Sequence, residues 1–193
     1  CVFVAQNNDM ANEIKSWYAS FSKTNQMVYC KSDVDIREDS VFNVAGDRLL
    51  IYKGSATSYT VPLEVKHIGL YAFQDNTTLT SIDFNRVETI GYSAFAKTKI
   101  TQIIFPEYIR EIGESAFSSA EMKSIVFADC SVNIGDNAFS GCPKIEEIDF
   151  GNNILTIGYG AFTCAGNGIE SIILPTSITY IGESAFEDAD IDT

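Results

Sequence analysis

The feature that most constrains this chain is an internal repeat. The string Ile-Gly-x-x-Ala-Phe, in which x is any residue, occurs six times, and successive copies start 22, 22, 22, 23 and 24 residues apart. The copies begin at Ile68, Ile90, Ile112, Ile134, Ile157 and Ile181. Self-similarity at a step of roughly 20 to 50 residues is typical of proteins that stack one supersecondary unit on the next. We therefore predict a repeat solenoid.

A second signature follows in each unit. Leu79-x-x-Ile82-x-Phe84 is the first copy, and its alternation predicts a strand with one buried side, on which Ile82 and Phe84 point inward. A shorter apolar piece, such as Val87-x-x-Ile90, comes next, and Asn, Gly or Pro separates the two as turn residues. One unit cannot enclose a core, but stacking places Ile on Ile and Phe on Phe. The repeated Gly indicates either an unusual backbone conformation or a close approach.

The two ends of the chain differ from the array. Residues 1–45 lack the repeat, and we interpret them as a capping segment of strand, helix and strand that covers the first layer. The helix is expected over 10–21, and the alternative for this segment is a fragment of an upstream domain. Residues 46–193 form the solenoid of about six repeats, truncated at its C-terminal end, with a hairpin turn at Gly46-Asp47.

Together, Ile-Gly-x-x-Ala-Phe and Leu/Ile-x-x-Ile-x-Phe/Leu-Pro resemble the BspA-like leucine-rich repeat, a short-repeat class of the leucine-rich-repeat superfamily. The resemblance covers about residues 50–191. It implies a right-handed, β-rich solenoid of the α/β horseshoe class, with a parallel sheet along one face. It further implies a secreted or cell-surface protein that adheres to host proteins or cells, and it supplies no catalytic residue.

Composition and motifs argue against several functions. The chain has 26 acidic and 13 basic residues and a formal charge of −13, which disfavours nucleic acid and anionic membrane surfaces as partners. No apolar run approaches the roughly 18 to 20 residues of a membrane span. His67 lacks a patterned partner and is expected at the surface, so we predict no enzyme, no cofactor and no metal site. We expect Cys130, Cys142 and Cys164 to be buried thiols, and a Cys1–Cys30 bridge stays open.

Outward positions of the main strands form the candidate binding surface, because side chains alternate across a strand. One column comprises Ser81, Gln102, Ser124, Glu147 and Ser171, and the next comprises Asp83, Ile104, Val126, Asp149 and Ile173. The second column exposes three β-branched apolar residues that the fold does not need outside, which suggests recognition. The alternative is that β-branched residues simply favour strands.

Three functions compete. The first is a protein-binding or adhesion module with a basic partner, whose binding weakens with salt. The second is a structural spacer in a longer array. The third is a carbohydrate-binding module that uses exposed aromatic residues, for which the candidates are Tyr92, Tyr108, Tyr159 and Tyr180. A sequon at Asn76-Thr77-Thr78 is a candidate glycosylation site.

Overall fold

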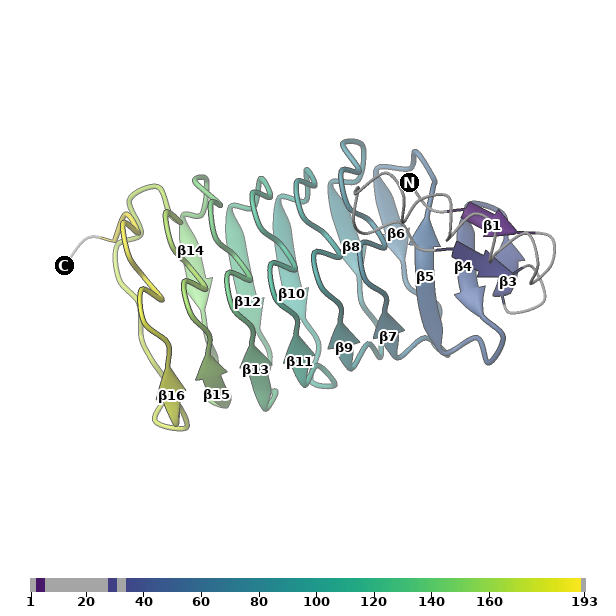
Figure 1. The fold of residues 1–193 in the computed structure, drawn as a ribbon. Helices are drawn as coiled ribbons and strands as arrows, with labels where there is room; N and C mark the ends of the chain where they lie inside the picture. The colour runs from purple at the N-terminus through teal and green to yellow at the C-terminus, as the bar shows by residue number, and fades with distance from the viewer. Residues whose placement is uncertain (1–2, 6–27, 31–33, 192–193) are drawn as a thin grey trace, which may run out of the picture.

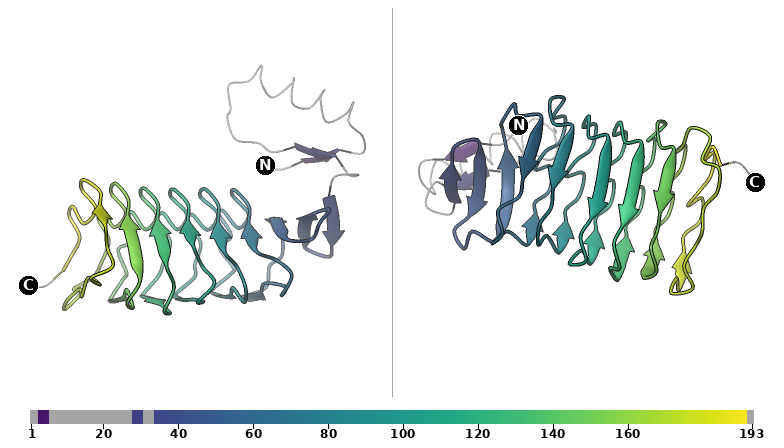
Figure 2. Two further views of the ribbon diagram at one scale, coloured as in Figure 1. Left: turned by 90° about the horizontal axis from the view of Figure 1, so that it is seen from below. Right: turned by 180° about the vertical axis from the view of Figure 1, so that it is seen from behind.

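The chain forms an elongated β-solenoid of about six turns, which lie side by side in one row (Figures 1 and 2). The structure is a computed structural model that describes residues 3–5, 28–30 and 34–191. Within these ranges it contains strands and turns and no α-helix, so the helical layer of an α/β horseshoe is not supported. The helix expected over 10–21 lies outside the described residues, and the right-handed coil stays a prediction.

The longest sheet has nine strands and is built mainly from the short Ile-Gly pieces. Its order is β16-β15-β13-β11-β9-β7-β5-β4-β3, parallel from β16 to β5 and antiparallel from β5 to β3. These strands are β3 (Val34–Arg37), β4 (Ser40–Asn43), β5 (Arg48–Tyr52), β7 (His67–Ile68), β9 (Thr89–Ile90), β11 (Glu111–Ile112), β13 (Val132–Ile134), β15 (Ile154–Ile157) and β16 (Tyr180–Ile181).

The Ile-x-Phe pieces form two shorter parallel sheets, β6-β8 and β10-β12-β14. Their strands are β6 (Ser58–Thr60), β8 (Ser81–Asp83), β10 (Gln102–Phe105), β12 (Ser124–Phe127) and β14 (Glu147–Asp149). The prediction of a parallel sheet along one face is therefore incomplete. Both apolar pieces of a turn pair with their equivalents in neighbouring turns, because each has a buried side and a free ladder edge.

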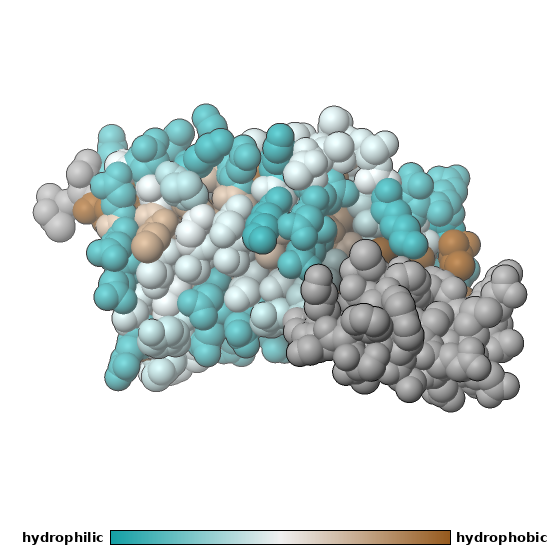
Figure 3. All heavy atoms as spheres, turned by 45° about the horizontal axis from the view of Figure 1, so that its top comes forward, coloured by the Kyte–Doolittle hydropathy of each residue, from teal (hydrophilic) through white to brown (hydrophobic). Residues whose placement is uncertain are grey.

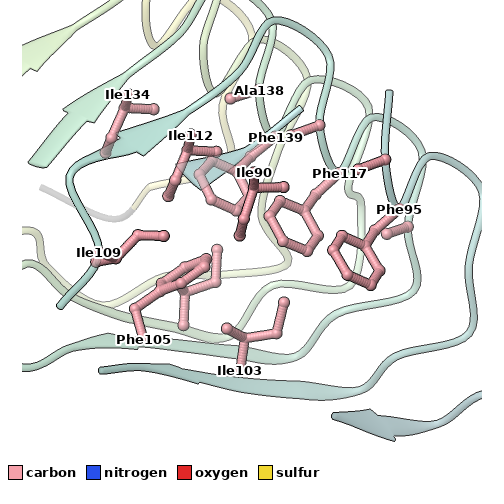
Figure 4. Close-up of a cluster of buried hydrophobic side chains, with 14 of the residues drawn as sticks. Ile90, Phe95, Ile103, Phe105, Ile109, Ile112, Phe117, Ile134, Ala138 and Phe139 are labelled. Carbon is pink, nitrogen blue, oxygen red and sulfur yellow. The ribbon is translucent and has the colours of Figure 1, made fainter. Parts of the chain in front are cut away.

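The core lies between the two sets of strands, as Figure 4 shows for the middle turns. Ile90, Ile112 and Ile134 line one side of it, Ile103 and Phe105 line the other, and all are buried. Two columns of rings run along the solenoid. In one, Phe73, Phe95, Phe117, Phe139, Phe162 and Phe186 stack face to face, and in the other, Phe84, Phe105, Phe127 and Phe150 do so.

The repeated glycines are explained by close approach of neighbouring turns. A Cβ on Gly113 would lie 2.8 Å from the carbonyl oxygen of Ile90 in the preceding turn. The Gly113 N–H donates to this same oxygen, also at 2.8 Å, so a side chain would push the turns apart at their hydrogen bond. Of the two explanations that the sequence allows, this contact is the correct one at Gly113, whose φ is not positive.

Two positions in each turn adopt the left-handed backbone conformation. The first precedes the Ala of the repeat and the second follows its Phe by two residues, as in Ser93 (φ 49°) and Lys97 (φ 60°). This geometry aims alternate N–H groups at the next turn. Ser93, Phe95 and Lys97 donate to the carbonyl oxygens of Glu114, Ala116 and Ser118, at 3.0, 2.7 and 2.9 Å. The edge that carries Ala-Phe is therefore a ladder that runs toward the C-terminal turn.

The N-terminal end of the array is closed by antiparallel strands. β4 and β5 flank a turn at Gly46, whose N–H donates to the carbonyl of Asn43 at 2.9 Å, as the predicted hairpin requires. Phe42 on β4 packs in the main core. The proposed boundary at residue 45 falls inside this hairpin, and the division into two domains stays a prediction. Farther upstream, β1 (Phe3–Ala5) pairs in parallel with β2 (Val28–Cys30).

The last described turn is less covered than those before it. Leu174 and Ile181 are 42% and 43% exposed, whereas Phe150 and Ile157, their equivalents one turn earlier, are buried. The ladder of the Ala-Phe edge also stops here. Within the described part of the chain, the backbone N–H groups of Ser184, Phe186 and Asp188 have no acceptor.

Candidate binding face

The ten residues that the sequence selects are here called the candidate face. Eight of them stand on strands β8, β10, β12 and β14, two on each. The register aligns Gln102 with Ser124 and then Glu147, and it aligns Ile104 with Val126 and then Asp149. The two columns therefore exist across β10, β12 and β14. Ser171 and Ile173 lie in the following turn, which forms no strand there.

The three apolar residues of the second column differ in their exposure and in their neighbours. Ile104 is 62% exposed and stands next to Val126, which is half-buried, as is Ser124. Ile173 is 82% exposed, but Asp149 stands between it and Val126. Figure 3 shows how hydrophobic residues appear in small groups among hydrophilic ones on the surface in view. The apolar part of the candidate face is thus the pair Ile104–Val126, with Ile173 apart.

A groove separates β8 from β10, because these two strands belong to different sheets. We call it the β8–β10 groove. Half-buried Ile82 and buried Phe84 lie at its base, and Ile104 stands on one wall. Its polar lining comprises Thr80, Ser81, Asn85, Thr101 and Gln102. Asp83 is the only ionisable residue in the lining, and its Oδ1 accepts the N–H of Asn85 at 3.0 Å.

A second groove lies between β14 and residues 169–173, and we call it the acidic groove. Its base is apolar, with Ile148, Phe150 and Ile169 buried. Four carboxylates line it, those of Glu146, Glu147, Asp149 and Glu170. The step between repeats is longest just here, and the added residues 163–168 lie in a loop before this segment. Among the described residues, the only β-bridge of this segment joins Ile169 to Ile191 in the following turn, so β14 has no strand partner on this side.

Few described cations balance the acidic groove. Lys123 Nζ lies 3.7 Å from Glu146 Oε1. Glu147 Oε2 accepts the hydroxyl of Ser124 at 3.5 Å, and Asp149 Oδ1 accepts the N–H of Gly151 at 2.9 Å. An exposed ion pair contributes only about 0–1 kcal/mol of stability. One lysine beside four carboxylates therefore leaves the groove with a net negative charge. Glu146 and Glu170 were not among the predicted site residues, although the longer repeat step after Phe162 is a signal that neighbouring turns separate there.

A second face, which was not predicted, lies on the nine-stranded sheet. Its outward column comprises Arg48, His67, Thr89, Glu111, Asn133, Thr156 and Tyr180, which pair in this order. His67 is half-buried, and its Nδ1 lies 2.8 Å from Thr89 Oγ1. Two shallow grooves run along this column beside the repeated glycines, one lined by Tyr92 and the other by Tyr180. The residue before each Ile-Gly pair would have revealed this column.

The cysteine prediction is wrong at one position. Cys130 and Cys142 are buried, and burial raises the pKa of their thiols to about 11 and about 12. Cys164 is exposed, because it occupies the position two residues after the Phe of its turn, where Lys97 and Ser119 are exposed as well. Cys1 falls outside the described residues. Within the described ranges, no three His, Cys, Asp or Glu residues are grouped to hold a metal ion.

The side chain of Asn76 in the sequon forms hydrogen bonds within the folded chain. Its Nδ2 donates to the carbonyl of Gly54 at 3.1 Å, and its Oδ1 accepts the N–H groups of Thr78 and Leu79. A glycan attaches to Nδ2, so the folded chain holds the reacting nitrogen in a hydrogen bond. This arrangement disfavours glycosylation after folding.

Comparison with protein families decides the identity of the array. A model of the BspA type leucine rich repeat region matches residues 45–162 and 110–193, in six copies. The chain belongs to this family. BspA-type leucine-rich repeats typically mediate protein interaction or adhesion and do not carry catalytic sites. The described residues include no helix with the length and apolar character that a membrane span requires.

Solved structures of other proteins share this fold. A leucine-rich repeat protein from Eubacterium ventriosum is 21% identical over 86% of this chain and 53% of its own, with a TM-score of 0.55. The pneumococcal vaccine antigen PcpA is 18% identical over 86% of this chain and 49% of its own, with a TM-score of 0.56. The chain spans about half the length of both proteins. No match was found among curated proteins.

Proposed function

We propose that this chain is a protein-binding module of a secreted or cell-surface protein, and that the candidate face takes up a basic partner protein without catalysis. The observation that carries the proposal is the pairing of exposed Ile104 with Val126 on adjacent strands, with Asp149 next in the same column. Apolar residues inside a polar rim are typical of protein recognition sites, and the excess of carboxylates favours a basic partner.

The charge of the whole chain supports the same kind of partner. A formal charge of −13 attracts cationic proteins over several ångströms and raises their association rate. Added salt screens this attraction over about 8 Å at physiological ionic strength. Binding is therefore expected to weaken with salt mainly through the association rate, while loss of the apolar pair raises the dissociation rate.

The test replaces the apolar pair by acids in one variant, Ile104→Asp with Val126→Asp. Surface plasmon resonance against a panel of purified basic extracellular proteins is expected to show binding to the native chain and loss of that binding in the variant. The control is Val44→Asp, which places an acid at an exposed residue in the turn between β4 and β5. Equal binding by all three chains, or binding to none of the basic proteins, contradicts the proposal.

A spacer function predicts a different result in this experiment. If the chain only sets a distance in a longer array, no surface replacement changes its behaviour, whereas removal of one whole turn does. The double variant therefore separates recognition from spacing, because it keeps the number of turns and alters only the candidate face.

Carbohydrate binding has one specific observation in its favour. Tyr180 is 57% exposed and lines a groove together with Glu111, Asn133 and Asp136, a mixture of ring and hydrogen-bonding groups that suits a sugar. Tyr92 lines the adjoining groove, whereas Tyr108 follows β10 and lines neither. A glycan array is expected to show binding that Tyr180→Ala removes and Tyr108→Ala preserves. An array without binding excludes this second function.

A further inference from the structure

The two grooves of the candidate face lie along the two opposite edges of one three-stranded sheet, and their linings differ in charge. The β8–β10 groove is apolar at its base and has one carboxylate, whereas the acidic groove has four. Strands β10, β12 and β14 run side by side between them (Figure 1). Eight of the ten residues of the candidate face line one groove or the other, and the remaining two, Ser124 and Val126, stand on the central strand β12.

The geometry sets the distance between the two grooves. Hydrogen-bonded strands lie about 4.8 Å apart, so two steps lead from β10 to β14, and half a step or more into each groove brings the distance between the groove centres to at least roughly 14 Å. An extended polypeptide rises about 3.4 Å per residue, so four residues cover this distance. Side chains four residues apart on an extended segment point to the same side, because the period of a strand is two.

We propose that the candidate face binds one extended segment of a partner protein that crosses strands β10, β12 and β14. An aliphatic side chain of the segment enters the β8–β10 groove beside Ile104, and a Lys or Arg four residues away enters the acidic groove. This inference rests on the proposed function, since it names what the same face recognises.

Charge complementarity decides which residue type enters which groove. Within the described residues, Glu147, Asp149 and Glu170 have no ion-pair partner, and Glu146 has only Lys123 at 3.7 Å. A guanidinium there gains charge-assisted hydrogen bonds to carboxylates that are already exposed, so little desolvation opposes them. In the β8–β10 groove, the walls of Ile104 and Pro106 over Phe84 favour an aliphatic side chain instead.

The experiment uses peptides that differ only in spacing. Each is a Thr/Ser-rich chain with one Ile and one Arg, separated by two, three, four, five or six residues and labelled with a fluorophore. Fluorescence anisotropy with the full chain is expected to give an affinity at a separation of four that is at least fivefold higher than at three or five. Equal affinity at all separations, or no binding, overturns the inference.

A charge exchange tests which groove takes the basic residue. The variant Glu147→Lys with Glu170→Lys is expected to bind the peptide with a separation of four at least tenfold more weakly than the native chain does. The same variant should bind again when the Arg of that peptide is replaced by Glu. The matched control, Glu114→Lys with Glu183→Lys, changes the net charge equally but alters the residues that follow the repeated glycines. If the control behaves like the variant, overall charge alone governs binding, and the inference is wrong.

The outcomes also separate this inference from the proposed function. If peptide spacing has no effect but Ile104→Asp with Val126→Asp still abolishes capture of a basic protein, then only the extended-segment inference fails. If neither peptides nor proteins respond to that double variant, the candidate face itself is wrong. Thermal unfolding of each variant checks that the solenoid remains folded in these comparisons.

Discussion

The rings of Phe117 and Phe139 lie parallel, with their planes 2° apart and their centroids 5.3 Å apart. Phe117 is fully buried and also stacks on Phe95 on its other side, at 5.0 Å. Phe117→Ala therefore removes ring contacts on both sides and leaves a cavity between turns. We expect a loss of about 3–5 kcal/mol in the free energy of unfolding, measured by urea denaturation.

The matched replacement is Phe186→Ala at the end of the same column. Phe186 is only partly buried and stacks on one ring of the column, that of Phe162 at 5.3 Å. Its loss is expected to cost clearly less than that of Phe117. Equal costs would show that stacking on both sides does not stabilise the column.

Gly113→Ala tests the close approach of neighbouring turns. The added methyl group would lie 2.8 Å from the Ile90 carbonyl oxygen and 3.0 Å from the carbonyl carbon of Gly91, so the turns must separate. We expect destabilisation of about 1–3 kcal/mol by thermal unfolding. Glu114→Ala, at the adjacent exposed residue, should change stability by no more than about 0.5 kcal/mol. A neutral Gly113→Ala would contradict the close-contact explanation.

Lys97→Gly is expected to stabilise the protein. Lys97 has a φ of 60°, which costs a residue with a Cβ about 1–2 kcal/mol, while glycine adopts it freely. Greater freedom of glycine in the unfolded chain offsets part of this gain, so the net increase should be up to about 1 kcal/mol. Lys99→Gly is the control, because Lys99 is exposed and its φ is not positive. It should destabilise slightly, and a gain equal to that of Lys97→Gly would disprove the role of φ.

Cys142 is expected to resist alkylation in the folded protein. Burial raises the pKa of its thiol to about 12, and only the thiolate reacts with iodoacetamide. At pH 8 the native protein should be labelled at exposed Cys164 and not at Cys142, as read by peptide mass spectrometry. Because the pKa of this thiol in the folded chain exceeds its ordinary value of 9.0, the thiol favours folding below pH 9 and loses that contribution as pH rises toward 12. Rapid labelling of Cys142 at pH 8 would show that its turn opens.

The repeat itself was readable from the sequence because its physics is periodic. Ile68, Ile90 and Ile112 pair in register, and the phenylalanines of each turn stack on those of the next, as alternation and stacking predict. The left-handed positions were not predicted, because residues such as Lys97, Ser119 and Cys164 occupy them where glycine would have been a signal. Their conformation follows from the hydrogen bonds between turns, which no single turn reveals.

The alignment of residues in the candidate face was predictable, whereas its grooves and the exposure of its side chains were not. Alternation gave the columns through Ile104 and Val126, but their exposure differs because Val126 has strand neighbours on both sides and Ile104 borders a groove. Ile173 is not paired in register with the rest of its column, because residues 170–174 form no strand after the inserted loop. Such breaks depend on how far neighbouring turns separate, which composition and spacing do not fix.

The backbone N–H groups of Ser184, Phe186 and Asp188 have no acceptor among the described residues, and this has an electrostatic consequence for the last described turn. Three parallel N–H dipoles leave partial positive charge at that end of the Ala-Phe edge, comparable in kind to the start of an α-helix. Carboxylates of Glu183, Glu187, Asp188 and Asp190 occur within the same stretch of chain. The negative charge of these acidic residues is thus opposite in sign to the partial positive charge of the N–H groups, and an approaching carbonyl oxygen would meet a row of donors.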